Sequence, residues 1–195
     1  MRLFLLAIAK LLVKWCDKTG RTHHITGGPN GTTVYMVRYI LVKNSLFSIY
    51  LHRFLRSDMD DPYDHPWNFA TYILKGEYTE HQYDMDKPVL NGRIEEDLKH
   101  AALSKRHYIS YWTETKENRG AGSLSFRPAR TVHRIAINKN YDLKDLKEAP
   151  FIICFMGRRR RQWGFWPAGD GGAVFVDWRK YLNIKPGDPR LEGSE

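Results

Sequence analysis

Several common signatures are missing from this sequence of 195 residues. Its two cysteines, Cys16 and Cys154, are too few for a disulfide framework and lack the spacing of a zinc site. There is no internal repeat, no low-complexity segment apart from the four arginines at 158–161, and no recognised DNA- or RNA-binding motif. The cysteine usage fits a reducing compartment, so we expect the protein in the cytoplasm.

A long hydrophobic run is also missing, although residues 1–15 begin basic and then turn apolar. Lys10 and Lys14 interrupt the run before it reaches the roughly 20 residues that a membrane span needs, and no small-residue cleavage site follows. One helical face carries the large apolar side chains, which are Phe4, Ile8, Leu11, Leu12 and Trp15. We therefore predict an amphipathic helix packed on the outside of the domain. The less favoured interpretation is a helix lying on a membrane surface, which the absence of any acidic residue before Asp17 supports.

The chain does have the composition of a β-rich core and a strongly basic charge. Hydrophobic residues make up 42% and aromatic residues 13%, which favours strands over a helical bundle. The length fits one domain, and we expect a helix and linker at 1–32, a β domain at 33–183 and a frayed tail at 184–195. The net charge of +9 favours anionic partners, either a small molecule, nucleic acid or acidic lipid, but it also serves solubility alone.

Runs of β-branched and aromatic residues predict a series of short strands. They fall at 34–42, 46–55, 65–74, 77–83, 107–113, 122–126, 131–137, 151–156, 162–166 and 173–176, before a short helix at 177–182. Residues 19–33 and 85–105 have the composition of loops. Many short strands with few helices predict an all-β sandwich or barrel.

The first predicted hairpin gives a candidate pocket wall. Pairing across the turn at 43–45 predicts an aromatic and polar face made of Tyr35, Val37, Tyr39, Leu41, Ser48, Tyr50, His52 and Phe54. Arg38 and Arg53 fall on the opposite face. Because burying two arginines would be costly, we expect the aromatic face to line the pocket.

The second predicted hairpin carries candidate ligands. If Lys75 and Gly76 form a two-residue turn, alternation places His65 and Glu80 on one face and turns His81 away. Asp64 then faces outward, where it would orient the loop or support a ligand indirectly.

Two segments resemble the motifs of the cupin superfamily, which are small double-stranded β-helix barrels. The first is His65 with the turn glycine Gly76, and the second is F-R-P-A-R-T-V-H-R-I at 126–135, with His133 as its histidine. The resemblance covers roughly residues 34–166. Taken whole, the chain resembles the small cupin-like proteins of phages and bacteria. The resemblance implies an all-β jelly-roll barrel in which the two motifs jointly bind a metal. The residue pattern adds an N-terminal amphipathic helix and a short C-terminal helix to this barrel.

The first motif departs from the family's pattern. A histidine pair separated by one residue would place its first member at Tyr63, and the family's glutamate would fall near Ala70. Glu80 or His52 could supply the missing ligands, which gives the candidate metal set His65, Glu80, His133 and His52. Two imidazoles and one carboxylate leave open positions suited to Fe(II) and oxygen chemistry. A site that also includes His52 would have three histidines and a carboxylate, and it could hold Fe, Mn, Ni or Zn.

The resemblance and these residues predict a metal-dependent cupin-type oxygenase with Fe(II), acting on a small or nucleotide-like anionic substrate. The stretch D-H-P-W at 64–67 resembles a segment of aspartyl and asparaginyl hydroxylases, which implies 2-oxoglutarate as a co-substrate. Arg160 or Arg134 would bind the anionic group. Trp67 and Tyr50 would pack against a substrate ring. We predict no catalytic residue beyond the metal ligands.

Two other functions fit the same pattern. A metal-dependent isomerase, lyase or hydrolase would use the metal as a Lewis acid. A non-catalytic cupin module would bind nucleic acid or protein through its basic surface, including 158–161. The fold class alone does not separate these functions, and it leaves a homodimer open.

Overall fold

The structure, a computed structural model, is mostly β and describes residues 2–27, 32–58, 61–84, 113–169 and 172–183. In chain order its elements are α1 (Arg2–Lys18), β1 (Thr22–Gly27), β2 (Thr33–Lys43), β3 (Ser48–Phe54), β4 (Phe69–Lys75), β5 (Glu77–Asp84), β6 (Thr113–Gly120), β7 (Leu124–Arg127), β8 (Val132–Ala136), the 3-10 turn η1 (Leu143–Asp145), β9 (Phe151–Met156), β10 (Gly164–Phe165), β11 (Ala168–Gly169), β12 (Gly172–Ala173), β13 (Val176–Asp177) and α3 (Trp178–Tyr181).

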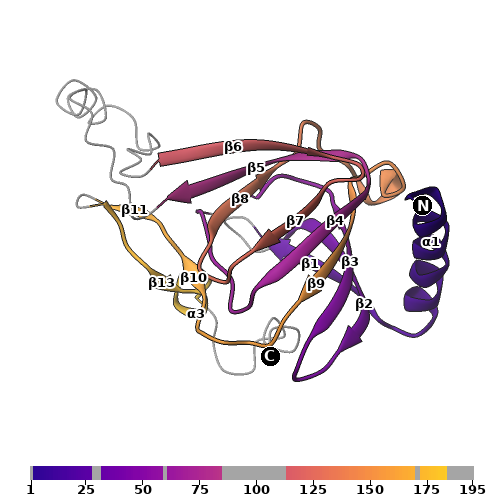
Figure 1. Cartoon of the computed structure of the whole chain (residues 1–195), viewed down its shortest axis with the longest axis horizontal. Helices are drawn as coiled ribbons and strands as arrows, with labels where there is room; N and C mark the ends of the chain where they lie inside the picture. Colours follow the sequence, from indigo (N-terminus) through magenta and orange to yellow (C-terminus); the bar gives the residue numbers. More distant parts are fainter. Residues whose placement is uncertain (1, 28–31, 59–60, 85–112, 170–171, 184–195) are drawn as a thin grey trace.

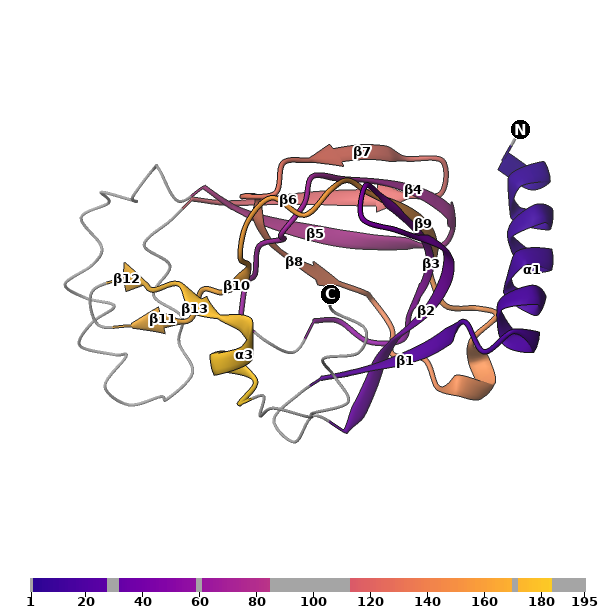
Figure 2. The same ribbon diagram turned by 90° about the horizontal axis from the view of Figure 1, so that it is seen from below.

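Two antiparallel sheets form the body of the domain (Figure 1). The larger has the strand order β1-β2-β3-β9-β4-β7, and the smaller has the order β6-β5-β8. Two short ribbons, β10 with β13 and β11 with β12, lie with α3 at the end of the molecule away from α1 (Figure 2). The antiparallel, mostly β class predicted from the strand pattern is confirmed.

Two hydrophobic cores share the larger sheet. The inner core lies between the sheets and consists of Met36, Tyr50, Phe54, Phe69, Ile73, Tyr78, Ile135, Ile137, Ile152, Cys154 and Met156. The outer core lies between the larger sheet and α1 and consists of Ala9, Cys16, Val37, Tyr39, Leu51, Leu55, Leu74, Ala149 and Phe151. The prediction that the N-terminal helix packs on the outside of the domain is therefore confirmed. Of the predicted apolar face only Leu12 packs on the outer core, because Phe4, Ile8, Leu11 and Trp15 are exposed. Within the described ranges, no helix has the length and apolar character of a transmembrane span.

Two edge strands were not predicted. β1, with the sequence T-H-H-I-T-G, lies within the predicted linker, and β6 has the sequence T-E-T-K-E-N-R-G. Each is an outermost strand of its sheet, β6 is largely exposed, and neither carries the apolar alternation that marks a half-buried strand. Residues 85–112, which include the predicted loop and most of the predicted strand at 107–113, lie outside the described residues, as does the predicted tail at 184–195.

The predicted hairpin at Lys75 and Gly76 is wrong. β4 pairs with β7 and β9 in the larger sheet, whereas β5 pairs with β6 and β8 in the smaller one. The chain therefore crosses between sheets at Gly76, which has a φ of +77°. A Cβ atom at this position would lie 2.9 Å from the Cα of Pro150, so both the conformation and the close approach call for glycine.

The predicted face of β2 is also wrong, and a β-bulge explains the error. Ile40 pairs with Tyr50, but Val42 pairs with Ile49, so Leu41 is an extra residue in β2. One extra residue exchanges the two faces of a strand. The interior of the domain consequently receives Arg38, whereas the outer core receives Val37 and Tyr39.

Candidate functional site

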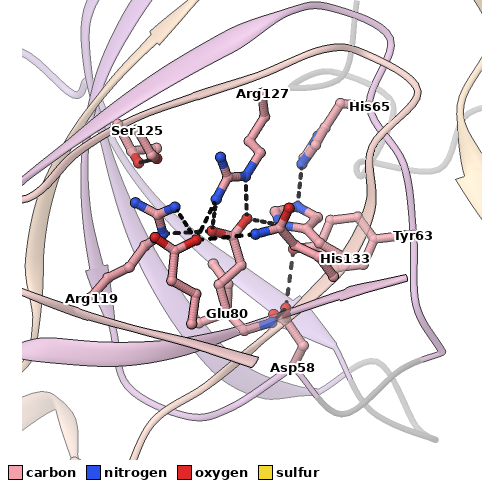
Figure 3. A network of polar contacts seen from close by, with 12 residues as sticks. Asp58, Tyr63, His65, Glu80, Arg119, Ser125, Arg127 and His133 are labelled. Atoms are coloured by element: carbon pink, nitrogen blue, oxygen red, sulfur yellow. Dashed lines mark hydrogen bonds and ion pairs between the residues drawn. The ribbon is translucent and has the colours of Figure 1, made fainter. Parts of the chain in front are cut away.

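Three side chains predicted as ligands lie in one hydrogen-bonded chain inside the domain (Figure 3). The Nε2 atoms of His65 and His133 are 2.9 Å apart, and Nδ1 of His133 is 2.8 Å from Oε1 of Glu80. Both Glu80 and His133 are only 2% exposed. The hydrogen-bonded chain therefore runs from His65 to His133 to Glu80, with His133 in the middle.

Different elements hold these residues in place. Glu80 lies on β5 and His133 on β8, which are neighbouring strands of the smaller sheet. His65 precedes β4, and its segment runs beside β8 because Tyr63 exchanges two backbone hydrogen bonds with His133. The backbone N–H of His65 also donates to Ala129 at 3.0 Å. The first histidine is thus positioned by pairing with the strand that carries the second.

Glu80 is held by two arginines as well as by His133. Arg119 donates through Nε to Oε2 at 2.8 Å, and Arg127 donates to both carboxylate oxygens at 2.9 and 3.1 Å. Burial raises the pKa of Glu80, but the hydrogen bonds and charges of His133 and Arg127 outweigh it and lower the pKa to about 2. Glu80 is therefore an ionised acceptor whose oxygens are already bound, and its predicted role as a direct metal ligand does not match this arrangement.

The ionised carboxylate fixes the tautomer of His133. Because Glu80 can only accept, Nδ1 of His133 carries a proton, and Nε2 of His133 faces His65. Burial, together with the charges of His133 and Arg38, lowers the pKa of His65 well below its usual range, so the ring of His65 is neutral. The two facing Nε2 atoms can share one proton or can both face a cation.

His52, the fourth predicted ligand, is bound elsewhere. Its Nε2 accepts from Nε of Arg38 at 3.2 Å, and its Nδ1 is 3.3 Å from the sulfur of Cys154. Burial and the charge of Arg38 lower its pKa well below the usual value. Among the residues that the structure describes, no group of three or more His, Cys, Asp or Glu side chains has an arrangement that could hold a metal ion. His52 therefore lies outside the hydrogen-bonded chain that joins His65, His133 and Glu80.

Neither arginine predicted to bind an anion points toward the histidine pair. Arg134 is opposite His81 in the strand register, on the face of β8 away from His133. Arg160 is exposed, and its backbone N–H donates to Pro66. The inward arginine of the run is Arg161, whose Nη1 lies 2.5 Å from Oδ2 of Asp64.

Asp64 was predicted to face outward but is completely buried. Its Oδ1 accepts from the backbone N–H of Gly164 at 2.9 Å, and its Oδ2 pairs with Arg161. Asp64, which precedes His65, therefore ties its own loop to the segment after β9. This contact agrees with the predicted role of Asp64 in orienting the loop.

Aromatic rings line the histidine pair. Tyr63 lies with its ring centroid 5.3 Å from that of His65, and Phe69 lies 4.6 Å from it. Trp67 stacks at 6.4 Å, and its buried indole Nε1–H has no acceptor within the described part of the chain. Tyr50, on the interior face as predicted, stacks on His52 instead, with 5.9 Å between ring centroids. Trp67 thus offers a hydrogen-bond donor beside the histidines.

Sequence reasoning missed three interior arginines. Arg127 follows Phe126 at the end of β7. Leu124 and Phe126 are exposed, so the alternation of β7 places its polar residues inside and its apolar residues outside. Arg119 belongs to a strand whose other residues are almost all exposed and polar. Arg38 was assigned to the wrong face by the bulge at Leu41. Only Arg127 had a usable signal, its place in the segment that resembles the second cupin motif.

No protein-family model matches the sequence, and no curated protein sequence is significantly similar to it. Among solved structures, similarity extends to hydroxypropylphosphonic acid epoxidase from S. wedmorenis, with 13% identity and a TM-score of 0.42 over 70% of this chain and 56% of that chain. KdgF from Halomonas sp. aligns with 14% identity and a TM-score of 0.39 over 66% of this chain and 85% of that chain.

A variant of oxalate decarboxylase from Bacillus subtilis aligns with 10% identity and a TM-score of 0.45 over 89% of this chain and 35% of that chain. The chain thus spans little more than half of the epoxidase and about a third of the decarboxylase. All three neighbours have the cupin fold. At these identities and TM-scores they carry no argument about activity, which must come from this chain's own residues.

Proposed function

We propose that the chain is a metal-dependent enzyme of the cupin superfamily, built on its double-stranded β-helix barrel, in which His65 and His133 hold a divalent metal. The observation that carries the proposal is the 2.9 Å separation of their Nε2 atoms. Two metal–nitrogen bonds of about 2.1 Å at a right angle set their nitrogens about 3.0 Å apart, so the pair fits two adjacent positions around one ion. Glu80, behind His133, has the place of the carboxylate that orients a ligating histidine.

Fe(II) is the proposed metal, because imidazole ligands with several open positions suit it. When bound, it would supply oxidation of the substrate by dioxygen, with 2-oxoglutarate as the proposed co-substrate. The protein's own contribution is positional. Glu80 keeps the proton of His133 on Nδ1, Arg119 and Arg127 keep Glu80 ionised, and the ring of Phe69 limits the access of water to the pair.

The proposed substrate is a small anion, and Arg38 is the proposed residue that binds its charged group, in place of the two arginines predicted from the sequence. Arg38 lies on the interior face, donates to His52 and has its guanidinium 5.1 Å from the ring centroid of Tyr50. Its charge contributes to the lowered pKa of His65. Trp67 would donate from Nε1 to an oxygen of the same substrate.

Anaerobic titration with Fe(II), and with Co(II) as a spectroscopic substitute, tests the metal site without relying on activity. We expect His65→Ala and His133→Ala each to weaken binding by at least about 100-fold, and Glu80→Gln to weaken it by about 10- to 100-fold. His24→Ala, which changes an exposed histidine on β1, is the matched control and should bind normally. Normal binding by His133→Ala would refute the site.

Dioxygen uptake by the metal-loaded protein, measured with and without 2-oxoglutarate, tests the oxygenase. Arg38→Gln should raise the KM for an anionic substrate by at least about tenfold, whereas Arg134→Gln, on the other face of β8, should leave it unchanged. Turnover of an anionic substrate without dioxygen uptake would instead identify an isomerase, lyase or hydrolase that uses the metal as a Lewis acid.

One contact favours a second candidate, a metal-free cupin module that binds nucleic acid or protein through its basic surface. If His65 carries its proton on Nε2, its 2.9 Å contact with His133 is a complete hydrogen bond that needs no metal. The module would show no Fe(II) binding that depends on His133, and its affinity for nucleic acid would fall steeply with salt.

A further inference from the structure

The side of α1 that faces away from the sheet carries a row of exposed apolar side chains. Phe4 is 68% exposed, Ile8 38%, Leu11 66% and Trp15 42%. Residues spaced by three and four positions lie along one line of a helix, so these four form a continuous stripe. The opposite side of α1 already packs on the outer core. The helix is therefore apolar on two sides, and the sheet covers one of them.

A row of lysines runs beside the stripe. Lys10, Lys14 and Lys18 are four residues apart, so they align along the helix, and at about 100° per residue their row adjoins that of Leu11. No acidic residue occurs in α1 before Asp17. Arg21, just beyond the helix, places its guanidinium 4.9 Å from the ring centroid of Trp15. The stripe is thus bordered by positive charge.

We propose that α1 docks the protein on the surface of a bilayer that contains anionic lipid. Phe4, Ile8, Leu11 and Trp15 would enter the boundary between headgroups and acyl chains, and the lysine row would contact lipid phosphates. Large apolar side chains next to lysines, with a tryptophan at the polar boundary, are what such an interfacial helix requires. The net charge of +9 brings the whole protein toward the same surface.

The positive charge beside the stripe favours a membrane, rather than a second copy of the chain, as the partner of α1. In a two-fold symmetric contact the same basic patch of each copy would lie within one interface, where like charges oppose association. An anionic bilayer removes that repulsion and attracts the lysines instead. The inference concerns a surface remote from the histidine pair and does not depend on the proposed enzyme activity.

Co-sedimentation of the full chain with vesicles tests the proposal. The vesicles are phosphatidylcholine alone, or phosphatidylcholine with about 30% phosphatidylglycerol. We expect binding to the anionic vesicles only, weakened at least about tenfold by the double variant Phe4→Ser, Leu11→Ser. Replacing Lys10 and Lys14 by glutamine should weaken it by about fivefold per lysine.

Val174→Ser is the matched control. Val174 is 61% exposed and lies in sequence between β12 and β13. These two strands lie at the end of the molecule away from α1 (Figure 2). Vesicle binding by this variant should equal that of the unaltered chain, and circular dichroism should confirm that every variant is folded. Three results would overturn the proposal: no binding to anionic vesicles, undiminished binding by the Phe4 and Leu11 variant, or a dimer in light scattering that this variant dissociates while vesicle binding is absent.

Discussion

At the scale of single residues, Asp64 is a buried charge that lies outside the hydrogen-bonded chain of His65, His133 and Glu80. It is fully buried, yet both its oxygens are satisfied, one by Arg161 and the other by the backbone of Gly164. Through these contacts a single carboxylate fixes the start of the ribbon that contains β10. The arginine run at 158–161 is therefore part of the folded structure rather than a purely solvated basic patch.

We expect Asp64→Ala to lower the free energy of unfolding by about 2 kcal/mol, because it leaves the N–H of Gly164 without its acceptor and removes a charge-assisted hydrogen bond. Urea denaturation measures the change. Asp64→Asn, which keeps an acceptor for Gly164, should lose less. Asp142→Ala, which breaks the exposed 3.9 Å pair with Arg56, should leave the midpoint unchanged, and an equally small effect of Asp64→Ala would contradict the account.

Two buried acids predict a loss of stability in alkaline solution. Burial raises the pKa of the Cys154 thiol from 9.0, and that of the Tyr78 phenol from 10.0, to about 12 in each case. Above about pH 9 the unfolded chain therefore binds fewer protons than the folded chain, so the free energy of unfolding falls as pH rises toward about 12. Below about pH 9 both contributions are fully present.

Urea midpoints measured from about pH 8 to about pH 11 should show this decline. Tyr78→Phe and Cys154→Ala should each make the decline shallower, whatever their effect at neutral pH, because each removes one titrating group. An unchanged slope in both variants would show that other groups cause the loss.

Residue-level expectations succeeded where strand alternation was undisturbed. Glu80 points inward and His81 outward as predicted, and His133 is buried in the interior. They failed for Arg38, where a local irregularity changes which face a residue occupies. One extra residue at Leu41 moved Arg38 inside, and no composition signal marks that bulge.

At the scale of elements, the turn after β4 is where sequence reasoning and structure differ most. A Lys-Gly pair between two predicted strands fits a hairpin, but the same glycine also serves a crossing between sheets. Local sequence specifies that the chain turns at Gly76, and only long-range pairing decides which strand β5 joins. The inward direction of Glu80 was thus predicted correctly from an incorrect pairing.

Gly76→Ala should destabilise the domain by about 1–3 kcal/mol from its positive φ alone, with a further loss from the contact with Pro150. Gly20→Ala separates the two causes, because Gly20 has a φ of +69° but no heavy atom within 4 Å of an added Cβ. Urea denaturation should therefore show a larger loss for Gly76→Ala. Equal losses would mean that the approach to Pro150 is easily relieved.

At the scale of the whole molecule, the larger sheet joins the inner and outer cores. Its strands contribute Tyr50 and Ile73 to one core and Leu51 and Leu74 to the other. Neither core can come apart without disturbing the sheet that serves the other. We therefore expect α1 and the two sheets to unfold in one transition.

Ala9→Glu tests this coupling, because Ala9 is 4% exposed and faces the outer core. A charge there should lower the urea midpoint measured by far-UV circular dichroism and by near-UV circular dichroism to the same extent. Ala7→Glu, on the exposed side of the same helix, is the matched control and should shift neither. Separate transitions for the two signals would show that the cores are independent.

The position of β9 has a consequence for how the protein is made. β9 lies between β3 and β4 in the sheet, although both precede it by a long stretch of chain. During synthesis on the ribosome, β1-β2-β3 and β4 with β7 remain separate pieces with open edges until Met156 has emerged. Open edges invite wrong pairing, so the nascent chain is most vulnerable to aggregation just before the segment that closes the sheet is translated.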